Sequence, residues 1–367
     1  MFFFFILFSH CDENCPDLNN QTFTGIIGYH ILNCDNNILR ISNSNFLSCY
    51  SPTQGGAICL KQLTQSSFIS NCMFVSCNST SDAGALYLFS SSNTLKYSCF
   101  SYCKAKNHQS AQIITDTTGV IDINYISLYS LGHSSFSQVS SFSTAAMAQH
   151  IINYLNNTGS SVAAQGAGIE ITNCQNLHSS YNTFFNNSGS NIIYYFFGLP
   201  SKPTSIQSST NSPSLRRSNI YQCITTGVGI IFFNNELNID ECVFCNNTGY
   251  PYIGFNSVKY PDVYLHIYDS YFDVDSAGLI HDQIILQNCR FGDLYPLNVV
   301  PNNTYAVCPN KDDFIQYSSQ SNGLHGSQIF VTVMVSLIGA PIVIAVVVLY
   351  IRSKMYPENN DSTPILQ

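Results

Sequence analysis

The sequence predicts an all-β fold: a right-handed parallel β-helix of about ten coils, followed by a single C-terminal transmembrane α-helix. Two observations lead to this prediction. An internal repeat with spacings of 19 to 36 residues runs through most of the chain, and a long apolar segment without charge follows it. Internal periods of this length are typical of solenoid proteins.

Each repeat contains an apolar anchor, and a small polar residue or a cysteine stands two positions before it. Eight of the ten repeats also carry Ile or Leu five positions before the anchor. A Gly- and Ala-rich segment, such as residues 55–60 or 83–88, follows several anchors by about ten residues. The anchors are Phe46, Phe74, Phe100, Ile126, Leu155, Phe184, Ile220, Phe244, Phe272 and Phe291. The residues two positions earlier are Ser44, Cys72, Ser98, Asn124, Asn153, Asn182, Ser218, Cys242, Ser270 and Cys289.

Short runs within each repeat alternate apolar and polar residues with period two, which is the pattern of β-strands. If successive coils stack, each strand pairs with its copy one coil further on, about 4.8 Å away. Each coil then contacts mainly its two neighbours, as in a solenoid. The alternatives are weaker, because β-sandwiches and barrels lack a fixed long period and the leucine-rich pattern is absent.

The composition restricts the class of partner. Only 9% of the residues are charged, and the formal net charge is −8. Nucleic-acid binding needs clustered basic charge, so we expect no nucleic-acid partner. Plentiful aromatic and branched residues argue against disorder.

The two ends of the chain predict export and membrane anchoring. Residues 1–11 resemble a secretory signal peptide, since an apolar run of about eight residues is too short to span a bilayer. Residues 329–351 are uncharged and long enough to cross it as one helix. Arg352 and Lys354 follow at once and place the tail in the cytosol. We therefore expect a type I single-pass protein of the plasma membrane, with its ectodomain outside the cell.

The predicted organisation has five parts. The signal peptide at 1–11 precedes a β-helix ectodomain at 12–316, which contains a Pro- and Ser-rich insertion loop at 199–214. A polar stalk at 317–328 leads to the transmembrane helix at 329–351 and a cytoplasmic tail at 352–367.

The cysteines and the glycosylation triplets agree with an extracellular location. Cys49, Cys77, Cys103 and Cys223 all stand three positions after an anchor, where adjacent copies could bridge. The disulfide candidates are Cys49, Cys72, Cys77, Cys99, Cys103, Cys242 and Cys245, with no connectivity deduced. The glycosylation candidates are Asn20, Asn78, Asn156, Asn186, Asn246 and Asn302.

No catalytic, metal or cofactor site is expected. Cys242 and Cys245 form a single CxxC, whereas zinc needs four ligands. Candidate carboxylates for acid–base chemistry occur at Asp269, Asp273, Asp275 and Asp282, with His281 nearby, but a solvated turn explains them better. Arg216 and Arg217, the Arg pair beside the insertion, are expected to lie on a solvated loop. No nucleophile elbow or P-loop motif is present.

The motifs resemble those of a known family. GGAI at residues 55–58 and FxxN at 184–187 and 244–247 are similar to repeats of polymorphic outer-membrane proteins, and elsewhere FxxC replaces FxxN. That resemblance implies a parallel β-helix used in surface adhesion. The bacterial members end in a membrane β-barrel, whereas this chain ends in one apolar segment. In this respect it resembles the single-helix, Cys-rich surface proteins of anaerobic protists such as trichomonads.

Three functions remain open. The first is adhesion to a protein or glycan on host or neighbouring cells, for which exposed aromatic residues such as Tyr194, Tyr195, Tyr250 and Tyr252 are suited. The second is a structural surface coat. The third is a polysaccharide lyase or hydrolase, since β-helices also host such enzymes, but we expect no enzymatic activity.

Overall fold

The computed structural model describes most of the predicted ectodomain. It describes residues 17–292 except for 26–28, 32–37, 117, 132–137, 159–165, 175, 197–212, 228, 234–235, 250–252, 256–263, 275–278 and 280–281. All described residues belong to the first of two compact units, which ends at Cys308. The predicted signal peptide, stalk, membrane segment and tail lie outside the described residues. Within the described part, no helix is long and apolar enough to cross a membrane.

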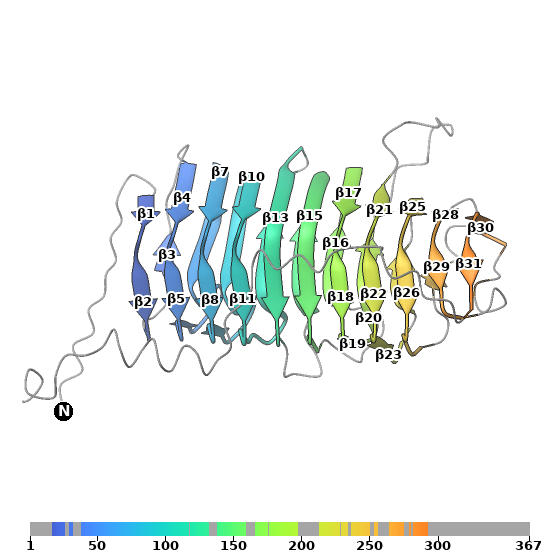
Figure 1. The fold of residues 1–367 in the computed structure, drawn as a ribbon. Helices are drawn as coiled ribbons and strands as arrows, with labels where there is room; N and C mark the ends of the chain where they lie inside the picture. The colour runs from blue at the N-terminus through green and yellow to red at the C-terminus, as the bar shows by residue number, and fades with distance from the viewer. Residues whose placement is uncertain are drawn as a thin grey trace, which may run out of the picture. The chain divides into compact units, whose positions relative to one another are not determined.

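Three ladders of parallel strands build the described fold (Figure 1). In the first ladder, each strand pairs in parallel with its copy from the next repeat, as Leu39 pairs with Ser67. Its strands are β1 (Asp17–Asn19), β4 (Ile38–Ser42), β7 (Ile58–Ser70), β10 (Leu86–Lys96), β13 (Val120–Tyr129), β15 (Ala146–Leu155), β17 (Asn176–Ser180), β21 (Ser214–Arg216), β25 (Leu237–Asp240), β28 (Leu265–Tyr268) and β30 (Ile284–Gln287).

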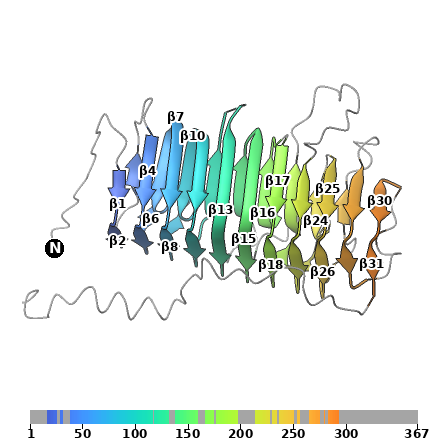
Figure 2. The ribbon, with the colours of Figure 1, turned by 45° about the horizontal axis from the view of Figure 1, so that its top comes forward.

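The second ladder follows the first after a bend, and it carries the anchors. Its strands are β2 (Thr22–Thr24), β5 (Asn45–Leu47), β8 (Met73–Val75), β11 (Cys99–Ser101), the ends of β13 and β15, β18 (Thr183–Phe185), β22 (Asn219–Tyr221), β26 (Val243–Cys245), β29 (Tyr271–Phe272) and β31 (Arg290–Phe291). Figure 2 shows these strands side by side in chain order, from β2 to β31.

The third ladder contains the Gly-rich segments and the strands that follow them. It joins the starts of β7 and β10 to β3 (Tyr29–Ile31), β12 (His108–Ile114), β14 (Gln138–Ser143), β16 (Gly166–Thr172), β20 (Asn191–Phe196), β24 (Ile231–Phe233) and β27 (Ile253–Phe255). Two short parallel pairs complete the coils: β6 (Tyr50–Ser51) with β9 (Asn78–Ser79), and β19 (Ser188–Gly189) with β23 (Ile224–Thr225). The predicted parallel β-helix, of the right-handed type, is thereby confirmed.

The interior is filled by a column of anchors, one from each rung of the second ladder. Phe46, Phe74 and Phe100 are at most 1% exposed, and their ring centroids are 5.0 and 4.7 Å apart. Pairing in register adds Phe23 before them and continues through Leu128, Tyr154, Phe184, Ile220, Phe244, Phe272 and Phe291. We call this column the inner stack.

Two predicted anchors are wrong. Leu128 and Tyr154 occupy the inner stack in place of Ile126 and Leu155. The reason is that β13 and β15 run through the bend as single strands, and isoleucines stand where other repeats have Ser, Cys or Asn. The small polar residue that marks the bend is therefore missing in these two repeats. Tyr154 is almost fully buried, and its hydroxyl accepts a hydrogen bond from Gln149 Nε2 at 3.0 Å.

The bend between the first and second ladders is made by one residue per rung with a left-handed backbone. This residue stands three positions before the true anchor, and its φ lies between 46° and 57°. We call this edge the first corner. Its residues are Asn20, Asn43, Asn71, Tyr97, Tyr125, Ile151, Tyr181, Arg217, Glu241, Asp269 and Asn288.

A second corner follows the second ladder, again with a left-handed backbone. It is formed by Gly25, Ser48, Ser76, Tyr102, Ser130, Asn156, Asn186, Gln222 and Asn246, two positions after the anchor. Asparagine and glycine tolerate this backbone region best, whereas tyrosine and isoleucine rarely adopt it. The aromatic residues at the first corner are therefore held there by the parallel pairing on either side.

Candidate functional site

The predicted disulfide cysteines lie mostly in two buried columns next to the corners. Cys72 and Cys242 stand two positions before the anchor, and Cys49, Cys77 and Cys103 three positions after it. Each thiol donates to a backbone carbonyl: Cys77 Sγ lies 3.3 Å from Phe46 O, and Cys242 Sγ lies 3.3 Å from Asp240 O. Serine and asparagine make the equivalent contacts in other rungs, as Ser98 Oγ does to Lys96 O at 2.8 Å.

These cysteines therefore satisfy the backbone polar groups that a left-handed corner leaves open. Burial raises the pKa of Cys72 to about 11 and that of Cys242 to about 12, which keeps both protonated and unreactive. In place of the predicted disulfides, the structure has thiols at Cys49, Cys72, Cys77, Cys103, Cys242 and Cys245. Cys99, on the outward side of β11, is disulfide-bonded. The repeat position thus selects a small hydrogen-bonding side chain, which cysteine also provides.

The predicted glycosylation residues concentrate at the second corner. Asn156, Asn186 and Asn246 occupy it, and Asn186 Nδ2 donates to Asn156 Oδ1 at 2.8 Å. Asn20 belongs to the first corner near the start of the described chain, Asn78 lies exposed in β9, and Asn302 lies outside the described residues.

The carboxylates considered for acid–base chemistry are only partly described. Asp269 and Asp273 lie at opposite ends of β29, so the strand separates them. Asp273 accepts a hydrogen bond from the backbone N–H of Asn246, which is a capping role. Asp275 and His281 lie outside the described residues. In the described part of the chain, no group of three or more His, Cys, Asp or Glu side chains is arranged to hold a metal ion.

The first corner carries aromatic side chains in consecutive rungs, of which Tyr97 is exposed and Tyr125, His150 and Tyr181 are half-buried. The rings of Tyr97 and Tyr125 stack with their centroids 4.8 Å apart, and Tyr97 is 48% exposed. Tyr125 then meets the edge of His150 at 6.1 Å, and His150 meets Tyr181 at 5.2 Å. His150 Nδ1 also lies 3.0 Å from Ser180 Oγ, which fixes the imidazole ring. We call Tyr97, Tyr125, His150 and Tyr181 the aromatic stripe.

The neighbouring rungs differ in chemistry. Before the stripe, Asn71 Nδ2 donates to Asn43 Oδ1 at 3.2 Å, and Asn43 Nδ2 donates to Asn19 Oδ1 at 3.0 Å. These asparagines form a polar amide ladder. After the stripe, Arg217 places its guanidinium carbon 5.6 Å from the centre of the Tyr181 ring and donates to the Tyr181 hydroxyl. Among the described residues, the aromatic side chains of this corner are therefore confined to its middle rungs.

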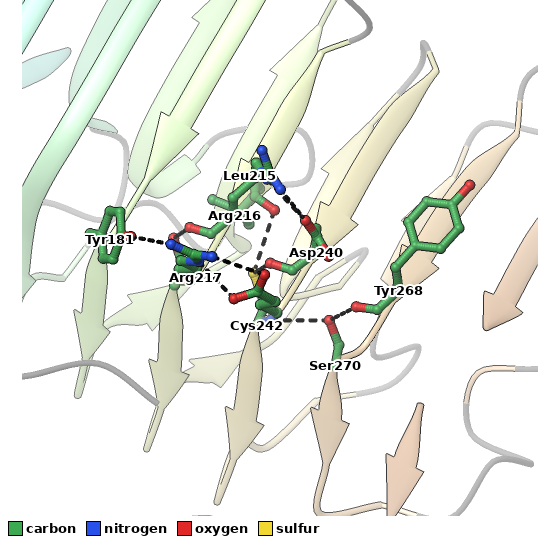
Figure 3. A network of polar contacts seen from close by, with 10 residues as sticks. Tyr181, Leu215, Arg216, Arg217, Asp240, Cys242, Tyr268 and Ser270 are labelled. Carbon is green, nitrogen blue, oxygen red and sulfur yellow. Dashed lines mark hydrogen bonds and ion pairs between the residues drawn. The ribbon is translucent and has the colours of Figure 1, made fainter. Parts of the chain in front are cut away.

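Two parallel ion pairs follow the stripe (Figure 3). Arg216 Nε and Nη2 both donate to Asp240 Oδ2, at 2.9 and 2.7 Å. Arg217 Nε and Nη2 bind the two oxygens of Glu241 at 2.6 and 3.2 Å. Hydrogen bonds from Arg217 hold the pKa of the Glu241 carboxyl below its usual range. Arg216 thus ends β21 and Arg217 forms the first corner, and both side chains are exposed and ion-paired, so the pair lies at a strand end and a corner and not in a loop.

A groove of about 700 Å³ opens beside these ion pairs, on the outward face of the first ladder. We call it the polar groove. Its lining crosses β17, β21, β25 and β28 and consists of His178, Ser179, Ser180, Tyr181, Ser214, Arg216, Arg217, Asn238, Asp240, Tyr268 and Asp269. The predicted insertion at 199–214 leads directly into β21, although its residues up to 212 lie outside the described part.

The aromatic residues chosen from the sequence are not those of the stripe. Tyr194 and Tyr195 are in β20 of the third ladder, and their side chains are not described. Tyr250 and Tyr252 lie outside the described residues. The stripe could have been found by tabulating the residue three positions before each anchor, because Tyr97 and Tyr181 share that position.

Comparison with known proteins gives no further assignment. No family model matches the chain, and no match is found among curated proteins or solved structures.

Proposed function

We propose that this chain is a type I cell-surface protein whose β-helix binds a partner on host or neighbouring cells through the aromatic stripe. The single observation that supports this most strongly is the run of aromatic rings in consecutive rungs, with Tyr97 exposed and the other three rings half-buried. The β-helix itself does not require them, because Asn43 and Asn71 form the same left-handed corner with small polar side chains. Tyrosine adopts this backbone less readily than asparagine, so a role outside the fold is the better explanation.

The chemistry of the stripe suits contact with another molecule. Tyrosine presents a rigid apolar ring and a hydroxyl at little cost in side-chain entropy, and it is enriched in interfaces. Stacking and edge contacts hold the four rings of the stripe in fixed positions before any partner arrives. This preorganisation lowers the entropy lost on binding.

The distribution of predicted glycans also supports the proposal. Asn156, Asn186 and Asn246 lie at the second corner, across the second ladder from the stripe. Glycans on these asparagines would leave the middle rungs of the first corner accessible. Asn20, the glycosylation candidate at the first corner, lies three rungs before Tyr97.

The location rests on the sequence. Residues 329–351 are uncharged and long enough to cross a bilayer, and Arg352 and Lys354 follow on the cytosolic side. The first eleven residues fit an export signal. Together they support a location of the β-helix outside the cell.

The test uses cells that express the full chain with an epitope inserted between residues 201 and 212. We expect antibody to label intact cells, and protease shaving to remove both the epitope and the adhesion of these cells to a target-cell layer. Cells that express the chain without residues 329–367 are the control and should release the epitope into the medium. An epitope that is reached only after permeabilisation, or adhesion that survives complete shaving, would refute the proposal.

A further inference from the structure

We infer that the polar groove binds a neutral oligosaccharide, which it holds between Tyr181 and Tyr268. This inference rests on the proposed function and names the class of ligand for the same face of the β-helix. Figure 3 shows the two tyrosines on either side of Arg216, Arg217 and Asp240. The groove volume of about 700 Å³ falls in the range of roughly 300–1,000 Å³ that is usual for small-ligand sites.

The floor of the groove is low because small side chains lie between larger ones. His178, Ser214, Asn238 and His266 are aligned in one column of the first ladder, and Ser214 interrupts the row of longer side chains. The next outward column runs from Ser180 through Arg216 and Asp240 to Tyr268. An extended ligand can therefore lie along the axis of the solenoid.

The charges of the groove are already paired, which favours a neutral ligand. Arg216 and Arg217 bind Asp240 and Glu241, and Asp269 adds one more carboxylate at the rim. An anionic ligand would have to displace a carboxylate from one of the arginines, and it would then lie close to the remaining carboxylates. Two cations against three carboxylates also leave this surface slightly negative, so sulfated or uronic-acid polymers are disfavoured.

A paired guanidinium and carboxylate still offer hydrogen bonds to a diol. The carboxylate oxygens retain free lone pairs, and each guanidinium retains N–H groups. One ligand hydroxyl can donate to Asp240 while its neighbour accepts from Arg216. Sugars carry adjacent hydroxyl groups that can make this pair of hydrogen bonds.

The two tyrosines supply the apolar part of a sugar site. Tyr181 has Arg217 over its ring and His150 at its edge, and Tyr268 lies beside His266, with the ring centroids 6.1 Å apart. Three rungs separate the tyrosines, which is roughly 14 Å at the usual strand spacing. That distance accommodates more than one sugar unit. Because the lining between them is mostly Ser, Asn and charged groups, the groove does not fit an apolar helix or a lipid chain.

The test is titration calorimetry on the full chain in lipid nanodiscs. The neutral probes are cellohexaose, maltohexaose and chitohexaose, and a heparin-derived hexasaccharide is the anionic probe. We expect at least one neutral probe to bind and the heparin fragment not to bind. Tyr268→Ala and Arg216→Ala should each lower the affinity for the neutral probe at least tenfold. Tyr50→Ala, which changes an exposed tyrosine outside the groove, should leave binding and the melting temperature unchanged.

The inference is overturned if no neutral probe binds, if the heparin fragment binds as tightly as the best neutral probe, or if both groove variants bind like the parent. Cell adhesion of the parent chain separates the two proposals. A parent that adheres but binds no neutral probe overturns the groove inference alone, whereas a parent that is neither exposed at the cell surface nor adhesive overturns the proposed function as well.

Discussion

The inner stack and the aromatic stripe are two columns of aromatic rings built by the same repeat. Phe74 and Phe100 inside the coil have centroids 4.7 Å apart, and Tyr97 and Tyr125 at the first corner have centroids 4.8 Å apart. The two phenylalanines are at most 1% exposed, whereas Tyr97 is 48% exposed. Parallel pairing imposes the spacing on both columns, so stacking alone does not distinguish a core from a binding surface.

Burial is what separates their roles. Removing a ring from the inner stack leaves a cavity that neighbouring strands cannot fill, because interiors are close-packed. Removing a ring from the stripe exposes a surface that water can cover. The inner stack therefore determines stability, and the stripe is free to serve recognition.

The largest difference is expected between Phe74→Ala and Tyr97→Ala. Phe74→Ala should lower the free energy of unfolding by about 3–5 kcal/mol through lost burial and a new cavity, and Tyr97→Ala by about 0.5 kcal/mol. Urea unfolding of the two variants measures both changes. Equal losses of unfolding free energy in the two variants would show that the stripe is part of the core and would contradict the distinction between the two columns.

A buried polar column extends the comparison. Asn187 Oδ1 accepts from Asn157 N at 2.9 Å, and its Nδ2 donates to Tyr154 O at 2.9 Å. Asn187→Ala leaves the backbone N–H of Asn157 and the carbonyl of Tyr154 buried without this partner. It should therefore lower the free energy of unfolding by about 2 kcal/mol. Asn186→Gly, at the exposed neighbouring corner position where glycine tolerates the left-handed backbone, is the control and should lower the free energy of unfolding by about 0.5 kcal/mol or less. A larger loss for Asn186 would contradict the assignment of the buried column.

A contact between His108 of the third ladder and Asp82 lies between these extremes. His108 Nδ1 is 3.4 Å from Asp82 Oδ1, and Asn107 Nδ2 donates to the same oxygen at 2.6 Å. The contact with His108, together with hydrogen bonds from Asn107, Gln54 and Ser81, holds the pKa of Asp82 well below its usual range. The stabilisation is therefore present above the unfolded pKa of about 3.9 and is lost as the pH falls below it.

Asp82→Asn should consequently destabilise the protein by about 1 kcal/mol at pH 7, after allowance for solvent screening. The difference from the parent should shrink steadily below about pH 4. Unfolding free energies measured between pH 3 and pH 7 give this profile. A difference that does not change with pH would mean that the charge of Asp82 is irrelevant.

The smallest effect is expected at a corner cysteine. Cys72→Ser should change stability by about 0.5 kcal/mol or less, because Ser44 and Ser98 make the same contact in the adjacent rungs. Loss of a disulfide would cost about 2–5 kcal/mol instead. The native protein should also resist alkylation of Cys72 at pH 8, since burial raises its pKa to about 11. A loss above 2 kcal/mol would favour a disulfide at this position.

Much of the fold could be predicted because the period appears at buried positions. Eight of the ten anchors lie in the inner stack, where any change of register would move apolar residues into water. The two wrong anchors fall in β13 and β15. Isoleucine stands two positions before the true anchor there, in place of the small polar residue, so the sequence no longer marks the bend.

The stripe and the groove could not be predicted to the same extent. A tyrosine with a left-handed backbone is unusual, so sequence patterns favour asparagine or glycine at a corner. The pairing of Arg216 with Asp240 depends on a register across 24 residues that only the fold brings together. Of the disulfide candidates, Cys99 is disulfide-bonded, whereas the others are thiols for a related reason: cysteine at a fixed repeat position has the same spacing whether it bridges or caps.

The central claim, that stability and recognition reside in two different aromatic columns, is tested most directly by a triple stripe variant. Tyr97→Ser, Tyr125→Ser and Tyr181→Ser together should reduce adhesion of expressing cells at least tenfold while the melting temperature stays within about 3 °C of the parent. Tyr50→Ser, Tyr102→Ser and Tyr129→Ser, away from the stripe, form the matched control and should adhere like the parent. Normal adhesion of the stripe variant, or equal loss in both triples, would contradict the account.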